Sequence, residues 1–208
     1  MAEKVDLKKL LKAFYNPEPK EPVILEIPPM QFLMIDGEGN PNTAPAYRDA
    51  LETLYAVSYT VKFMMKQEHG LNYPVMPLEG LWWGTPLGHT HFTAADKDLF
   101  RWTAMIMQPD FVTPELMAEG IRRAAAKKPL AAADKLRFET FAEGLAVQVM
   151  YFGPYDAEGP TIERMHQFAY EKGYELAGKH HEIYLGDPRR TAPEKLKTVL
   201  RHPLRRPG

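Results

Sequence analysis

The chain has 208 residues, of which 45% are hydrophobic and 25% are charged, and its net charge is −1. This is the composition of an ordinary globular protein with no bulk electrostatic attraction to nucleic acid or to an anionic membrane. Cysteine is absent, which excludes disulfides, thiol catalysis and cysteine metal sites, and the N-terminus lacks the apolar core of a signal peptide.

No window approaches the ~18 consecutive apolar residues of a membrane span. We therefore expect a cytoplasmic protein. In chain order, apolar spacing predicts a short helix over residues 7–14, and apolar runs predict strands at 23–27 and 32–35. Thr43 as N-cap and Pro45 in the first turn predict the start of a long helix, which Gly70 ends.

Strand-like segments follow at residues 73–76, 78–83 and 102–108. Thr113 and Pro114 open a helix with an acidic first turn and a basic end, as the helix dipole favours. Strands are predicted at 138–141 and 145–152, a helix at 160–172 that Gly173 ends, and a long strand at 174–185. Residues 191–194 form a capping box that predicts a helix through residue 200, and the basic end that follows is expected to be a frayed, solvated tail.

This order predicts an α+β fold in which helices cover one face of largely antiparallel sheets. The runs at residues 34–37 and 150–153 each lead into a helix that ends at a glycine, and a glutamate follows nine residues after each glycine. The pattern suggests two β-α-β-β repeats, about 22–110 and about 136–200, joined by a connecting helix at about 113–128. Neither unit has a secure core alone, so we expect a single domain over 1–208. Packing about a pseudo-two-fold axis would bring Glu79 and Glu182 to one shared cleft.

Both glutamates lie among bulky apolar side chains, which distinguishes them from the usual solvated strand glutamate. Desolvation raises a carboxyl pKa and makes the group a better base near neutral pH. Strand alternation places Glu182 on one face with His180 and Tyr184, and Glu79 on one face with Trp83. Alternation turns Trp82 the other way unless Gly80 forms a bulge, so the tryptophan that faces the cleft is left open.

Two pairs of histidines, at 89 and 91 and at 180 and 181, could in principle share a metal ion. Neither pair has a spaced third ligand, so surface or structural roles are favoured and no metal or organic cofactor is expected. His180 could instead orient Glu182. The chain has no GxGxxG, P-loop or GxSxG motif, and its single serine lies inside a helical pattern.

The chain resembles the GyrI-like small-molecule-binding family over nearly its whole length, and four segments carry the resemblance: residues 32–42, 77–83, 105–113 and 178–198. The chain is most similar to the stand-alone bacterial members, which resemble enzymes that hydrolyse cyclopropanoid DNA-alkylating toxins. The resemblance implies two β-α-β-β repeats around a pseudo-two-fold axis, with a ligand cleft between them.

The resemblance also implies site residues. Glu182 matches the family's pocket glutamate and is the best candidate for a catalytic base, and Glu79, Trp82 and Trp83 match its tryptophan-bearing strand. The remaining ligand-binding candidates rest mainly on sequence pattern: Tyr55, Tyr59, Trp102, Tyr155, His180 and Tyr184.

The predicted function is therefore cofactor-free detoxification, in which a carboxylate-activated water opens cyclopropanoid or similar electrophilic aromatic toxins. The alternative is a non-catalytic binder or sink for cationic amphipathic drugs, because a carboxylate among aromatic rings also suits multidrug binding. The expected partner is a planar aromatic or cationic small molecule, with no nucleic acid and no membrane. A protein partner is left open.

Overall fold

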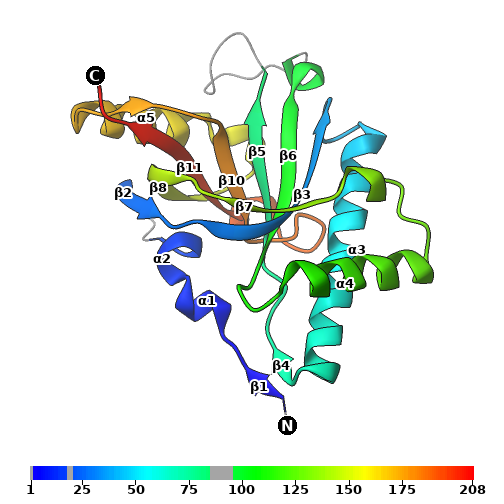
Figure 1. Cartoon of the computed structure of the whole chain (residues 1–208). Coiled ribbons are helices and arrows are strands. Elements are labelled where there is room, and N and C mark those ends of the chain that lie inside the picture. The colour runs from blue at the N-terminus through cyan, green and yellow to red at the C-terminus, as the bar shows by residue number, and fades with distance from the viewer. Residues whose placement is uncertain (1, 18–20, 85–95) are drawn as a thin grey trace.

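The computed structural model describes residues 2–17, 21–84 and 96–208, and it contains one large, curled antiparallel sheet with helices packed against it (Figure 1). The α+β prediction is confirmed. The strands of this sheet follow one another in the order β2 (Val23–Ile27), β8 (Gly144–Phe152), β11 (Lys197–Arg205), β10 (His180–Tyr184), β5 (Leu78–Trp83), β6 (Arg101–Gln108), β3 (Met30–Glu38) and β7 (Arg137–Phe141). Beside them, β9 (Glu175–Leu176) pairs with β11, and β1 (Glu3–Lys4) pairs with β4 (Leu71–Asn72) in a separate parallel ladder.

The helices lie on the two faces of this sheet. Helix α3 (Pro45–Glu68) packs on β3 and β6, and α4 (Pro114–Lys127) packs on α3. Helix α5 (Gly159–Glu171) covers β8 and β11, and Figure 1 shows it at the end of the sheet away from α3. The short helix α2 (Lys12–Tyr15) contacts the opposite face of the sheet, and α1 (Leu7–Leu10) packs beside α2. The 3₁₀ turns are η1 (Asp96–Leu99), η2 (Ala133–Lys135), η3 (Tyr155–Ala157) and η4 (Pro193–Lys195). None of the helices in these described ranges is long and apolar enough to cross a bilayer.

The strand order is symmetric about the central β5–β10 pair. On one side of it lie β6, β3 and β7, and on the other lie β11, β8 and β2. Each half thus contributes one outer strand to the other half, because β2 pairs with β8 and β7 pairs with β3. This is a symmetry of connectivity, and the internal repeat itself stays a prediction.

Most predicted elements are present, with shifted ends. Helix α4 begins as predicted, because the Thr113 side chain accepts a hydrogen bond from the backbone N–H of Leu116. Helix α3 begins one residue later than predicted, with Ala44 as its N-cap and no side-chain cap. The single strand expected at 174–185 is two strands, because Gly178 between them has a φ of +63°, which interrupts extended backbone.

The C-terminal predictions are wrong. The capping box forms only the short turn η4, and the residues after it form β11 instead of a helix and a frayed tail. Strand β11 hydrogen-bonds to β10 on one side and β8 on the other, and Arg201 and His202 within it are buried. Pairing on both edges and burial outweigh the local helix signal here.

Candidate functional site

The two predicted glutamates lie on opposite faces of the central strand pair. Directly opposite residues of an antiparallel pair point to the same face. Here Glu182 is opposite Gly80, and Glu79 is opposite Ile183. The prediction that Glu79 and Glu182 share one cleft is therefore wrong. A spacing of nine residues after a glycine does not fix strand register, and a one-residue offset turns a side chain to the other face. We call the face that bears Glu182 the α3/α5 face and the face that bears Glu79 the α2 face.

Glu182 is held by fixed donors on the α3/α5 face. The Tyr184 hydroxyl donates a 2.7 Å hydrogen bond to Oε2, and His180 Nε2 lies 3.2 Å from Oε1. Trp82 Nε1 donates in turn to the Tyr184 hydroxyl at 3.0 Å. Trp82 is therefore the tryptophan that faces Glu182. The side chains of His180, Glu182 and Tyr184 share one face, as strand alternation predicted.

The pKa of Glu182 lies below its ordinary value. Burial raises this pKa, but hydrogen bonds and electrostatic attraction from His180, together with hydrogen bonds from Tyr184 and Glu158, outweigh burial. This corrects the expectation of a raised pKa. At neutral pH Glu182 is an ionised carboxylate that is 9% exposed, so a small part of it remains open to solvent.

Aromatic rings surround this carboxylate. The Tyr155 ring lies 5.4 Å from that of Tyr184, and Tyr47 lies 5.8 Å from Trp82. Burial and the charge of Glu182 raise the pKa of Tyr155 to about 12, and they also raise the pKa of Tyr47. Both hydroxyls therefore stay protonated, and they can donate hydrogen bonds at neutral pH.

A glycine makes room for the Trp82 indole. A Cβ at position 80 would lie 2.6 Å from Trp82 Nε1, closer than real contacts allow. Gly80 thus lets the indole lie over its own strand and reach Tyr184. The bulge considered for this residue is not needed, because the β5–β10 ladder runs through it in regular register.

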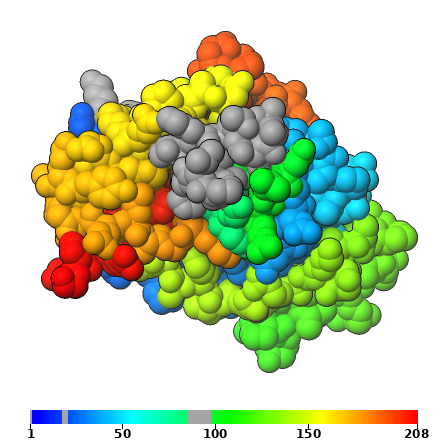
Figure 2. Space-filling model, turned by 90° about the horizontal axis from the view of Figure 1, so that it is seen from above, coloured from blue at the N-terminus to red at the C-terminus, as the bar shows by residue number. Residues whose placement is uncertain are grey.

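The other predicted tyrosines lie further along α3. Tyr55 lies near enough to Asp187 for that carboxylate to raise its pKa, and near enough to Tyr155 to raise the pKa of Tyr155. Figure 2 shows the corresponding segments together: the yellow residues after β8, the orange residues after β10 and cyan α3. Tyr55 stacks on Tyr59 with centroids 6.4 Å apart, and both line a groove of about 420 Å³ between α3 and α4.

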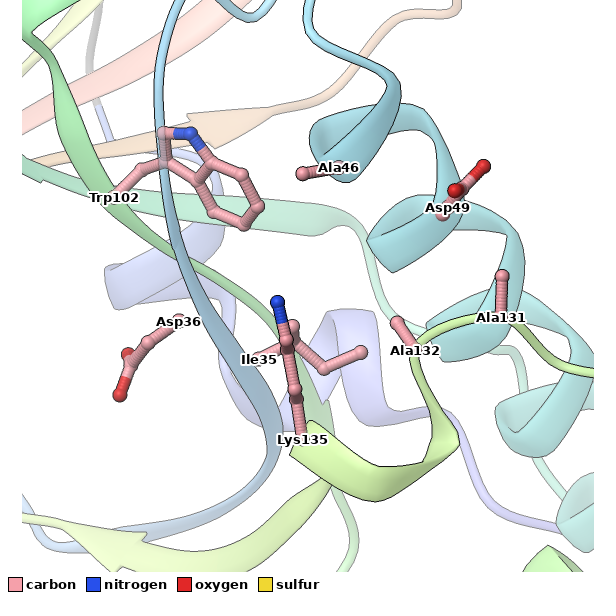
Figure 3. A pocket seen from close by; sticks show the side chains of 8 residues that line it. All are labelled: Ile35, Asp36, Ala46, Asp49, Trp102, Ala131, Ala132 and Lys135. Carbon is pink, nitrogen blue, oxygen red and sulfur yellow. The ribbon is translucent and has the colours of Figure 1, made fainter.

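Trp102 is placed behind the Glu182 site. It is 1% exposed, and the ring of Tyr47 lies 4.9 Å from the Trp102 ring and 5.8 Å from that of Trp82. Its indole lines a small hollow of about 230 Å³ that also borders the first turns of α3. Figure 3 shows the Lys135 side chain pointing into this hollow.

On the α2 face, Glu79 belongs to a closed polar network. The Tyr15 hydroxyl donates to its Oε1 at 2.6 Å, and His181 Nε2 lies 3.0 Å from its Oε2. The other His181 nitrogen lies 2.9 Å from Glu143, which accepts from Arg201 at 2.9 Å. Arg201 also donates to the side chain of Gln148 and the backbone carbonyl of Phe14 in α2.

This α2-face network has no exposed member to offer a ligand. Glu79 and Arg201 are 0% exposed, and His181 is 1% exposed. Trp83 points to the same face as Glu79 and lies beneath the ammonium group of Lys179, 3.4 Å from its ring centre. Neither Glu79 nor Trp83 is thus brought to the Glu182 site.

Two residues of the Glu182 site were missed by sequence reasoning. In the sequence, Tyr47 has the spacing of an ordinary apolar-face residue of α3, and Glu158 is an ordinary residue just before α5. Only the packing of α3 and α5 on one face brings them to Glu182, so spacing gave no signal. Of the histidines considered as metal ligands, those at 89 and 91 lie outside the described residues.

Comparisons with known proteins agree with the fold and the chain length. The model of the family described as GyrI-like small molecule binding domain matches residues 20–205. An uncharacterized conserved protein from Listeria innocua is 39% identical, with a TM-score of 0.88 over 97% of this chain and 100% of that one. Two structures described as hydrolases from Listeria innocua are 38% and 39% identical, with TM-scores of 0.84 and 0.86, over 97% and 98% of this chain and 100% of theirs. None of the curated proteins matches the chain in sequence.

Proposed function

We propose that this chain, which belongs to the GyrI-like small molecule binding domain family, is a hydrolase that binds planar, electrophilic aromatic compounds on the α3/α5 face and adds water to them with Glu182. The observation that carries the proposal is the environment of Glu182, an ionised carboxylate held by Tyr184 and His180 inside an aromatic wall. Two of its relatives at 38% and 39% identity are described as hydrolases, which supports a hydrolytic reaction.

The substrate class that we propose is a cyclopropane joined at a spiro carbon to a conjugated cyclohexadienone, as in cyclopropanoid toxins. Water oxygen bonds to a ring carbon, the strained carbon–carbon bond breaks, and its electron pair moves through the dienone to the carbonyl oxygen. The ring becomes a phenol, so aromatisation and strain release drive the step. One water is added, nothing is oxidised or reduced, and the proton taken from water ends on the phenol oxygen.

Glu182 acts as the acceptor of the water proton. A carboxylate has about four lone-pair positions, and Tyr184 and His180 occupy two of them, so a position remains for water. Fixed donors keep the carboxylate in one orientation, and general base catalysis of this kind contributes typically ~10²–10⁴-fold in rate. The protonated hydroxyls of Tyr47 and Tyr155 are the donors that we propose for the oxygen that gains negative charge.

The test is turnover of a spiro-cyclopropyl cyclohexadienone, followed by mass spectrometry for the product with one added water. Glu182→Gln is expected to lower kcat by about 10²–10⁴-fold while the compound still binds. The matched control is Glu26→Gln, which neutralises an exposed glutamate on the outer strand β2 and should keep the wild-type rate. Wild-type turnover by Glu182→Gln would overturn the assignment of the base.

A second candidate is a binder or sink for cationic aromatic drugs. It is favoured by the same ionised carboxylate, because aromatic walls and a buried negative charge both attract a flat cation. One experiment distinguishes the hydrolase from the non-catalytic binder. A sink binds the cyclopropanoid or ethidium saturably, forms no product, and loses its affinity for ethidium in Glu182→Gln.

A further inference from the structure

Three histidines from three elements converge beside the Glu182 site. His166 comes from α5, His180 from β10 and His202 from β11. One ring nitrogen from each lies within 4.8 Å of the others, and the side chains are buried, with exposed fractions of 5%, 0% and 1%. The rings of His166 and His202 are 4.9 Å apart and perpendicular, and those of His180 and His202 are 5.9 Å apart.

We propose that these three histidines form a binding site for a divalent transition-metal cation of the zinc class. Imidazole nitrogen is a preferred ligand of zinc, and three histidines leave a fourth position open, as in catalytic zinc sites. A cation bound at this point would be enclosed by three buried side chains that come from three separate elements.

Glu182 fixes the orientation of one ligand. His180 Nε2 lies 3.2 Å from Glu182 Oε1, so contact with the carboxylate holds the imidazole in one orientation. In this orientation Nδ1, on the opposite side of the ring, is the atom that would bind the cation. A carboxylate that holds a ligating histidine in this way is the common outer partner of histidine metal sites, and its negative charge offsets the charge of the cation.

The geometry requires a modest contraction. Zinc–nitrogen bonds of about 2.0–2.1 Å in tetrahedral geometry place the nitrogens about 3.4 Å apart. The largest separation here is within 4.8 Å, so side-chain rotation and a small shift of α5 are enough to close the site. A bound cation would tie α5 to the two strands beneath it, and it would therefore stabilise the folded chain.

The experiment uses the tag-free full chain, treated with a chelator and dialysed at neutral pH. Cobalt(II) titration is expected to give visible d–d bands of low-coordinate cobalt that saturate at one equivalent, and zinc is expected to displace them. Zinc should also raise the unfolding temperature. If wild-type protein shows neither the bands nor a shift in unfolding temperature, the proposal is overturned.

Variants then locate the cation. His202→Gln removes one ligand and is expected to weaken cobalt binding at least 100-fold, whereas His69→Gln, at the exposed C-cap of α3, should leave it unchanged. Glu182→Gln keeps all three imidazoles, and loss of the outer carboxylate should weaken binding 10–100-fold, so it tests the site if His202→Gln does not fold. Cobalt bands that survive in both variants would place the cation elsewhere and overturn the proposal.

The cation site does not depend on the proposed hydrolysis. Cobalt binding without turnover of the cyclopropanoid would contradict only the proposed function. Turnover by protein that binds no cobalt would contradict only the proposed cation site.

Discussion

Glu79 and Glu182 lie on neighbouring strands, yet the two faces of the sheet give them different environments. On the α2 face, Tyr15 and His181 bind the two oxygens of Glu79, and no part of the residue is exposed. On the α3/α5 face, Glu182 is also hydrogen-bonded, but its surroundings are aromatic and it keeps a small exposed fraction. The element that covers each carboxylate, and not the residue type, decides its role.

The α2-face network joins distant parts of the chain. Arg201 near the C-terminus binds the carbonyl of Phe14, and Gln148 binds the carbonyl of Ala13. Tyr15, the next residue after Ala13 and Phe14, donates a hydrogen bond to Glu79. The network thus fixes α2 on the sheet through buried, charge-assisted hydrogen bonds, whose loss is costly. On the α3/α5 face, by contrast, the carboxylate of Glu182 keeps a small exposed fraction of 9%.

The largest effect that this comparison predicts is on stability, from Arg201→Met. The substitution removes the guanidinium from the buried carboxylate of Glu143, whose pKa His181 and Arg201 hold at about 2 against the effect of burial. Leaving such a charge without its partner costs about 3–5 kcal/mol. The measurement is the free energy of unfolding in urea.

Arg205→Met is the matched control for this substitution. Arg205 lies on the same strand and pairs with Glu175, but the two side chains are 68% and 47% exposed. Exposed pairs contribute about 0–1 kcal/mol. Equal losses for the two variants would show that the α2-face network does not stabilise the fold as we infer.

The second effect is a loss of stability near pH 8, which His181 on the α2 face predicts. Burial lowers the pKa of His181, but Glu143 and Glu79 outweigh burial and raise it from 6.5 to about 8. A raised pKa stabilises the fold fully below pH 6.5, and this contribution, roughly 2 kcal/mol, is lost as the pH rises through 8. Glu143, with its pKa of about 2, contributes above pH 4.5 and loses that contribution as the pH falls through 2.

The lowered pKa of Glu182 makes the α3/α5 face contribute on the acid side. The raised pKa values of its tyrosines, whose ordinary value is 10.0, act only at a higher pH than this measurement covers. Unfolding free energies between pH 5 and 9 should therefore fall through pH 8 in the wild type. The decline should be absent in His181→Gln, which is less stable but cannot titrate at this position. A decline of the same size in that variant would assign the alkaline loss to other groups.

The sequence predicts the Glu182 side of this comparison better than the Glu79 side. Alternation along one strand is a local property, so it correctly places His180 and Tyr184 with Glu182, and it points Trp82 away from Glu79. Register between β5 and β10 depends on the whole sheet, and the spacing from a preceding glycine does not determine it. The shared cleft fails for this reason.

The same limit explains the C-terminus. Residues 191–194 carry a good local helix signal, but the strand that follows pairs on both edges and buries Arg201. From sequence alone, a basic segment at a chain end is predicted to be solvated. Here Arg201 of that segment is instead hydrogen-bonded to Glu143, Gln148 and the backbone of α2. The histidine cluster is likewise invisible in the sequence, because its members come from three separate elements.

The smallest predicted effect is on the α3/α5 face alone, from Gly80→Ala. The new methyl group would lie 2.6 Å from Trp82 Nε1, so the indole must rotate away and lose its hydrogen bond to Tyr184. We expect a stability loss of about 1 kcal/mol, at the low end for overpacking, because a side chain and not the backbone gives way. Losing one neutral hydrogen bond is worth about 1 kcal/mol, so affinity for ethidium should fall by up to about tenfold.

Tryptophan fluorescence reports both the rotation and the binding. Gly186→Ala is the matched control, because a Cβ there first meets a Leu196 methyl group at 3.4 Å, an ordinary contact. If Gly80→Ala binds ethidium as the wild type does, the Trp82–Tyr184–Glu182 chain is not part of the ligand site. If the variant instead loses the alkaline decline of stability, the two faces are coupled through β5, and the separation drawn between Glu79 and Glu182 is wrong.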